Sequence, residues 1–245
     1  LLIFLMANVL TGPMTADGMS TAPDGLLLFA QEQSNAIWKL WPDGRAFAEY
    51  PYVLGAGAVS VDGNGRIFTV ERGCTDPGLT NLTCDRPSRV VELGATRRVV
   101  ADHFADGSSL GRLNDLHADG QGGAWFTQGE LYHAANDGTV TLTADVTVFS
   151  NGVVTSPDGR TLYVTDRTSI IALDVAPDLT TSNQRVFATL LQREHRIAVR
   201  GAVGHRRGGN ALRIRHPGPV RAAGRADVVF MQRGRAVPAS VRTVE

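Results

Sequence analysis

The sequence lacks several features that would identify the class of protein at once. It has no run of the roughly 18 apolar residues that a membrane-spanning helix requires, and it contains no His-Glu-x-x-His motif. The second absence disfavours a zinc protease of the type that carries this motif. Apolar residues at helical spacing are also missing from residues 1–190, so we do not expect an all-α protein.

Cysteine is scarce as well. The two cysteines, Cys74 and Cys84, lie in a segment rich in Pro, Gly and Asn, and without neighbouring histidines they make a poor metal site. A loop disulfide in an oxidising compartment and two free thiols both fit this spacing. The apolar first ten residues fit either a first strand or a degenerate secretion signal. Localisation, cytoplasmic or periplasmic/secreted, therefore stays open.

Basic residues are sparse in most of the chain and concentrated at its end. Residues 1–191 hold 12 Lys+Arg and 21 Asp+Glu, whereas residues 192–245 hold 12 Arg, no Lys and 3 acidic residues. We predict a folded domain over 1–191 and an Arg-rich tail over 192–245 that is disordered or an out-of-frame translation. A basic arm for nucleic acid is the third interpretation, but the tail has a single aromatic residue, Phe230, for base stacking.

A turn followed by a short apolar strand recurs through the first region. Asp24, Asp62, Asp119 and Asp158 each precede a glycine, at steps of 38, 57 and 39 residues. Asp-Gly favours tight turns because glycine adopts positive φ at no steric cost. A period of about 40 residues with several short strands per unit is typical of a β-propeller blade. The sequence thus predicts an all-β propeller with about four readable blades; a β-sandwich is the alternative.

Three oxygen-bearing residues share one position in this repeat. Asp17, Asn114 and Asn151 each lie twelve residues before the aromatic residue of the blade's next strand, where the second blade has Ala56. In a propeller, equivalent positions at the start of the inner strand converge on the central channel. Carboxylate and amide oxygens are the ligands that calcium prefers. Each residue alone also suits a turn, and the shared register is what favours a metal site.

Three stretches resemble the gluconolactonase family, which includes senescence marker protein and luciferin-regenerating enzyme. They are ADGMSTAPDG (16–25), LGRLNDLHADG (110–120) and FSNGVVTSPDG (149–159). The resemblance implies a six-bladed β-propeller that holds a divalent cation, usually calcium, in its channel and hydrolyses lactones or related esters. About four of those six blades are present in this chain.

The resemblance also implies roles for individual residues. Asp17 stands at a metal-binding Glu of the family and Asn151 at an amide metal ligand, while Arg112 and Asn114 match substrate contacts and Asn114 also faces the metal. Asp115 is a candidate catalytic group, with bracing of its loop as the alternative.

Two further expectations concern the completeness of the site. Glu71, at the end of a strand, is a candidate for contacting substrate at the pocket mouth, with a surface charge as the alternative. The family's remaining ligand, an Asp that is also a candidate general base, has no match in residues 186–245. The chain is then expected to be inactive or poorly soluble if later blades are needed.

The predicted function is metal-assisted hydrolysis, in which a cation polarises the lactone carbonyl and Arg112 and Asn114 orient the ester. We expect a small-molecule lactone or ester as partner, no nucleic acid or membrane, and a monomer. A non-catalytic propeller that binds a ligand or a protein at its channel is the competing hypothesis.

Overall fold

The computed structural model describes residues 16–75, 83–84, 86–144, 150–190, 214–215, 228–232 and 235–239. The first ten residues and the side chains of Asp17, Cys74 and Cys84 lie outside this description. Within these ranges every regular element is a β-strand. None of the described residues forms a helix long and apolar enough to cross a membrane.

The strands form four consecutive antiparallel sheets. The first sheet contains β1 (Ala16–Thr21), β2 (Leu27–Gln31), β3 (Ala36–Leu40) and β4 (Ala46–Pro51). The second contains β5 (Ala56–Val61), β6 (Ile67–Glu71), β9 (Arg89–Leu93) and β10 (Arg98–Ala101). The third contains β11 (Leu116–Ala118), β12 (Ala124–Gln128), β13 (Glu130–Ala134) and β14 (Val140–Ala144). The fourth contains β15 (Ser150–Thr155), β16 (Thr161–Asp166), β17 (Ser169–Val175) and β18 (Thr181–Leu190), extended by β19 (Ile214–Arg215).

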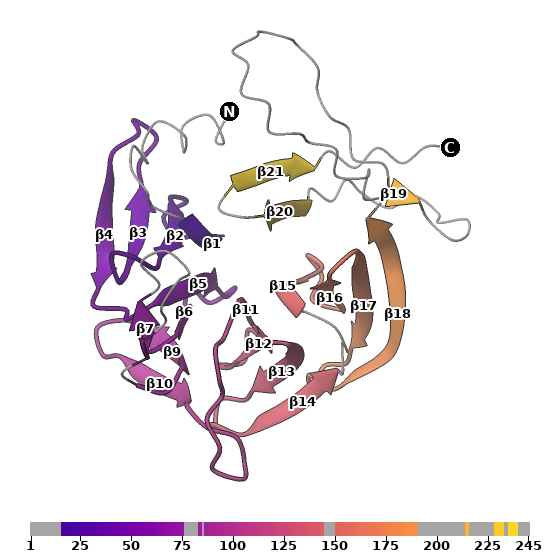
Figure 1. The fold of residues 1–245 in the computed structure, drawn as a ribbon. Helices are drawn as coiled ribbons and strands as arrows, with labels where there is room; N and C mark the ends of the chain where they lie inside the picture. Colours follow the sequence, from indigo (N-terminus) through magenta and orange to yellow (C-terminus); the bar gives the residue numbers. More distant parts are fainter. Residues whose placement is uncertain are drawn as a thin grey trace, which may run out of the picture.

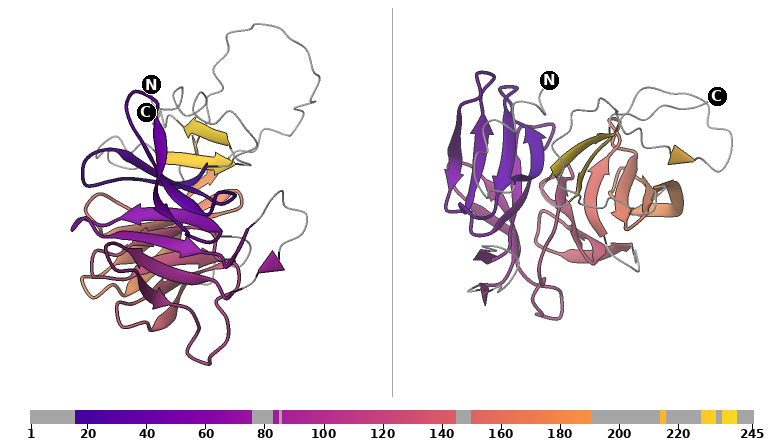
Figure 2. Two further views of the ribbon diagram at one scale, coloured as in Figure 1. Left: turned by 90° about the vertical axis from the view of Figure 1, so that its left-hand side faces the viewer. Right: turned by 45° about the horizontal axis from the view of Figure 1, so that its top comes forward.

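These sheets are the blades of a propeller. They lie around a common centre in the order of the sequence, with β1, β5, β11 and β15 innermost (Figure 1). Seen from the side, neighbouring sheets face one another (Figure 2). The prediction of an all-β propeller with four readable blades is therefore confirmed. The two-stranded sheet of β20 (Val228–Gln232) and β21 (Arg235–Ala239) lies in the gap between the first and fourth blades (Figure 1), and the prediction about the tail stays a prediction.

The predicted Asp-Gly turns join the first and second strands of each blade. In all four, the aspartate Oδ1 accepts a hydrogen bond from a backbone N–H two residues later, at 3.1 Å for Asp24, 2.8 Å for Asp62, 2.6 Å for Asp119 and 3.1 Å for Asp158. Such local bonds favour turns over continued strand. The carboxylate therefore ends one strand and sets the direction of the next.

The long second step of the repeat contains an insertion between β6 and β9. Its described strands, β7 (Cys74–Thr75) and β8 (Thr83–Cys84), form a separate two-stranded sheet. Their register places Cys74 and Cys84 directly opposite each other along the backbone. The insertion thus leaves the four-stranded order of the second blade unchanged.

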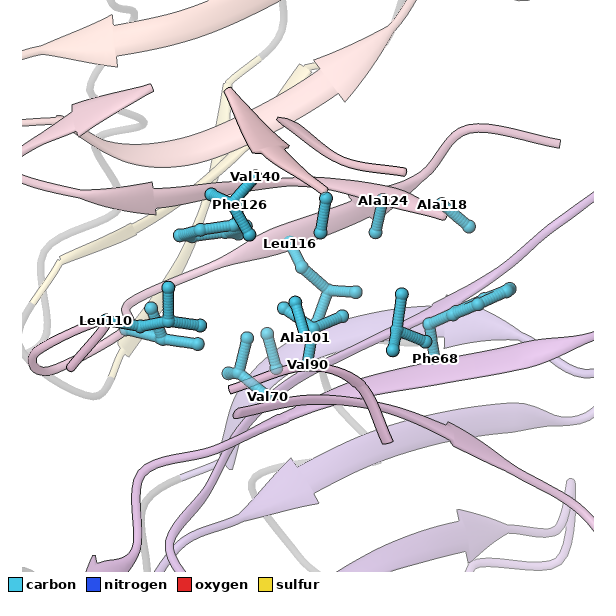
Figure 3. Close-up of a cluster of buried hydrophobic side chains, with 14 residues drawn as sticks. Phe68, Val70, Val90, Ala101, Leu110, Leu116, Ala118, Ala124, Phe126 and Val140 are labelled. Atoms are coloured by element: carbon cyan, nitrogen blue, oxygen red, sulfur yellow. The ribbon is translucent and has the colours of Figure 1, made fainter. Parts of the chain in front are cut away.

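Apolar side chains between neighbouring blades form the core. The largest cluster joins the second and third blades, where Phe68 and Val70 face Leu116 and Phe126 (Figure 3). Phe68 and Phe126 are completely buried, and burying a side chain of this size stabilises the fold by about 1.5–3 kcal/mol. Further clusters join the first blade to the second and the third to the fourth.

Candidate functional site

A bulge occurs near the start of each inner strand and defines the equivalent positions. The pairing register shifts between Asp17 and Met19 in β1, between Ala56 and Ala58 in β5, and between Ser150 and Val153 in β15. Each shift accommodates one extra residue, which bends the strand and redirects its side chains. Such bulges are common beside functional sites.

The third blade has the same irregularity just before β11. Thr127 N–H donates to the Asp115 carbonyl at 3.0 Å, and Asn114 N–H donates to the Thr127 carbonyl at 2.8 Å. The next residue pair in register is Leu116 and Phe126. Counted from the first pair after the bulge, Asp17, Ala56, Asn114 and Asn151 occupy one backbone position on four blades. Sequence spacing had suggested the same alignment.

Asn114 and Asn151 come together at the junction of the third and fourth blades. The Asn114 amide Nδ2 donates to the Ser150 carbonyl at 3.4 Å, and the Thr127 hydroxyl donates to the Asn151 carbonyl at 2.5 Å. In this orientation Oδ1 is the remaining acceptor of the Asn114 amide, while the Asn151 side chain is exposed. The side chain of Asp17 lies outside the described part, and its backbone pairs with Ala30.

Asp115 links the third blade to the fourth. Its Oδ1 accepts the Leu116 N–H at 2.9 Å and its Oδ2 accepts the Val153 N–H at 3.1 Å. Both bonds come from the main chain, and one of them crosses between blades. These contacts suit the bracing role; the catalytic role stays a prediction.

A buried ion cluster lies beside Asn114 and was not expected from the sequence. The Arg72 guanidinium bonds Glu32 through Nη1 and Oε2 at 2.8 Å, and the two side chains are only 4% and 7% exposed. Arg112 bonds the other oxygen of the same carboxylate, from Nη2 to Oε1, at 3.1 Å. Buried charges require such pairing, because an unpaired ion in the interior is strongly destabilising. The predicted substrate contact Arg112 is thus anchored at this cluster.

Glu71 is buried and surrounded by donors. Its Oε1 accepts the Leu54 N–H at 3.1 Å, and its carboxylate pairs with Arg97 and, through Oε2, with Arg89 Nε at 3.7 Å. These contacts tie β6 to the chain entering β5 and to β9. The predicted contact of Glu71 with substrate stays a prediction.

The oxygen-bearing residues predicted at the shared inner-strand position are of the type that binds a hard cation. Asn114 and Asn151 contribute amide oxygens, and calcium takes 6–8 oxygen ligands from carboxylates, amides, backbone carbonyls and water. Among the described residues, no group of three or more His, Cys, Asp or Glu side chains gathers in a metal-binding arrangement. A cation at this position would therefore have to draw on amide or main-chain oxygens as well as on any carboxylate.

The sequence analysis did not predict the pair of Glu32 and Arg72, although both residues occupy a recognisable position in the repeat. Each directly follows the second strand of its blade, at the position after Gln31 and after Glu71. Opposite charges at matching places in consecutive repeats are compatible with a pair across blades. The spacing of 40 residues does not by itself show that the two side chains turn toward each other.

The four blades and their inner strands define the chain as a β-propeller. The profile of the SMP-30/gluconolactonase/LRE-like region matches residues 15–203. The chain belongs to this family.

Solved structures share the fold at low sequence identity. A gluconolactonase from Xanthomonas campestris is 20% identical with a TM-score of 0.58, over 71% of this chain and 62% of that one. A luciferin-regenerating enzyme is 16% identical with a TM-score of 0.50, over 74% and 63% of the two chains. An auxiliary nutrient binding protein from Bacteroides thetaiotaomicron is 11% identical with a TM-score of 0.52, over 70% and 41%. This chain thus spans less than two thirds of the length of each of these proteins.

Proposed function

We propose that this propeller hydrolyses lactones or related esters with the help of a hard divalent cation, calcium in the first instance. Membership of the family supports the lactonase class. The cation and the reaction are inferences from the residues of the channel.

What carries the proposal is the shared bulge position on the inner strands. Three blades bring Asp17, Asn114 and Asn151 to that position. An isolated asparagine before a turn needs no ligand, but three oxygen-bearing residues at one repeated position do not follow from turn chemistry. Ala56 on the second blade has no side-chain ligand atom. The aspartates that form the turns lie at the opposite end of the inner strands.

Each residue has a distinct task in this proposal. Asp17, Asn114 and Asn151 would hold the cation, which would supply Lewis-acid polarisation of the ester carbonyl and stabilisation of the developing oxyanion. Arg112 contacts substrate oxygens while Glu32 holds its guanidinium in place. Asn114 orients the ester from the same segment, and Asp115 fixes that segment to the fourth blade.

The test is hydrolysis of a panel of γ- and δ-lactones, measured with calcium and after chelation. We expect turnover with calcium, and a loss of about 100-fold or more in kcat/KM for Asn114→Ala, because the cation that would stabilise the oxyanion loses a ligand. Asn64→Ala is the matched control, since Asn64 bonds the Gly120 carbonyl at 3.2 Å in a turn at the other end of the strands.

Different results would reassign the protein. Calcium binding without turnover of any lactone would favour a propeller that binds a ligand at its channel. Neither binding nor turnover, in a chain that melts cooperatively, would contradict the proposal.

A further inference from the structure

Arg72 connects three blades through one guanidinium. It bonds Glu32 on the first blade at 2.8 Å. Its Nε donates to the Leu113 carbonyl at 2.8 Å, and its Nη2 donates to the Asn114 carbonyl at 3.1 Å, both on the third blade. The Arg72 backbone belongs to the second blade, where its carbonyl accepts the Ser88 hydroxyl at 3.1 Å. Each of the three guanidinium nitrogens of Arg72 therefore has a partner on another blade.

The second blade is built to admit this side chain. A Cβ on Gly57 would lie 2.6 Å from Arg72 Nε and 2.7 Å from its Cζ, far closer than atoms approach. Gly57 is the unpaired residue of the bulge in β5, directly after Ala56. In the second blade, which has Ala56 in place of an oxygen ligand, the Arg72 side chain therefore packs directly against the bulge at Gly57.

The partners of Arg72 are the residues around the proposed substrate contacts. Two of its bonds go to the main chain at Leu113 and Asn114, and the third goes to the carboxylate that also binds Arg112. Arg72 itself is 4% exposed, so substrate does not reach it. Arg112 is 31% exposed and lies at the accessible edge of the cluster.

We propose, on the basis of the proposed function, that Arg72 is a positioning residue that fixes the Arg112–Asn114 segment in its substrate-binding geometry. Three differently directed bonds from one planar group need a guanidinium. A lysine ammonium keeps the charge beside Glu32 but loses the fork that reaches both carbonyls. The chain then gains freedom at the residues that contact the ester.

Arg72→Lys tests this, with Arg98→Lys as a matched control. Arg98 also bonds one carboxylate, Glu92 at 2.7 Å, and two carbonyls, Gly122 at 2.9 Å and Asn136 at 3.1 Å. Those carbonyls lie in turns beyond the other end of β11 and β13. The two variants therefore remove comparable bonds at opposite ends of the blades.

We expect Arg72→Lys to lower kcat/KM by about tenfold or more, mainly through a higher KM, and Arg98→Lys to change it by less than about twofold. Guanidinium ion at low, non-denaturing concentration should restore activity to Arg72→Ala. Thermal melts of all variants show how much stability each has lost. Equal losses of activity in the two lysine variants, or full activity in Arg72→Lys, would overturn the proposal.

A second readout separates this proposal from the proposed function. If the unaltered chain hydrolyses no lactone, the hydrolase proposal fails, but the NMR signals of the Asn114 backbone and side-chain amides still report its position. We expect these signals to shift in Arg72→Lys and to stay unchanged in Arg98→Lys. Unchanged Asn114 signals in Arg72→Lys would contradict the positioning role whatever the activity.

Discussion

The two ends of the blades differ in how far their residues repeat. We call the end with the Asp-Gly turns the turn end and the end with the inner-strand bulges the site end. At the turn end, all four blades use the same device, an aspartate that accepts a backbone N–H two residues later. At the site end, the bulge position differs from blade to blade, with Asp17, Ala56, Asn114 and Asn151 in turn. The repeat is uniform where it closes hairpins and varied where the inner strands meet the channel.

This difference also appears in how charge is buried. The turn carboxylates are bonded within their own blade. Asp24, Asp43 and Asp158 are exposed, while the buried carboxylates of Asp62 and Asp119 pair with Arg66 and His133 of the same blade. At the site end, Glu32 and Arg72 are buried and bonded across blades. Loss of the buried charge shared across blades should therefore affect stability more than loss of an exposed pair at the turn end.

The largest effect is expected for Glu32→Gln. It leaves Arg72 and Arg112 without their shared carboxylate, and breaking a buried ion pair costs about 3–5 kcal/mol. Asp43→Asn at the turn end removes an exposed pair with Arg45 and should leave the unfolding free energy unchanged within error. Urea denaturation of both variants measures the contrast, and equal destabilisation of the two would refute it.

A smaller loss of stability is expected at acid pH, through a histidine that lies between the turn end and the site end of its blade. His117, midway along β11, bonds the Thr155 hydroxyl at 2.8 Å, and burial lowers its pKa to about 4 from the usual 6.5, with Asp119 acting in the opposite direction. The unfolded chain binds this proton at higher pH than the folded chain does. Stability from neutral His117 is therefore complete above pH 6.5 and is lost as pH falls toward 4, by at most about 3 kcal/mol.

The measurement is the unfolding free energy of the unaltered chain and of His117→Gln between pH 7 and 4. The variant should show a shallower decline across that window. An identical decline in both proteins would assign the acid sensitivity to other groups.

The next smaller effect is expected for alanine substitution of a glycine, which should cost more stability at the bulge than at the turn. Gly57→Ala forces a methyl group against the buried Arg72 guanidinium, and overpacking of this kind costs about 1–3 kcal/mol. Gly63→Ala, at the turn end of the same blade, meets nothing within 4 Å. Thermal melts should show a clear loss for Gly57→Ala alone; a comparable loss at Gly63 would mean that the bulge is not specially constrained.

The smallest effect is expected for Thr127→Val. Its hydroxyl donates to the Asn151 carbonyl at 2.5 Å and accepts the Asp115 N–H at 3.1 Å, so the variant loses two bonds at the blade junction, worth about 1–2 kcal/mol together. Thr141→Val, at an exposed position of β14, is the control. Denaturation midpoints that move equally for both would show that the junction bonds add no stability.

The sequence predicted the features that depend on local chemistry. The Asp-Gly pairs identified the turns because the turn bonds join residues two apart, and the twelve-residue spacing aligned Asp17, Asn114 and Asn151 because each blade has the same bulge. The family also followed from short motifs around these residues.

Contacts across blades were beyond such reasoning. Glu32 and Arg72 meet because Gly57 leaves room at the second bulge, a fact of packing that no local motif states. For Glu71, the strand end was foreseen but not the Leu54 N–H and the two arginines that engage its carboxylate. The strand pattern gives the position of a side chain but not its partners.

Calorimetric titration with calcium tests most directly whether the residues at the shared position of the inner strands bind a cation. We predict a saturable site in the unaltered chain that Asn151→Ala weakens strongly and Asn64→Ala leaves intact. Identical titrations for all three proteins, or no binding by a cooperatively folded unaltered chain, would contradict a cation held by oxygens from separate blades.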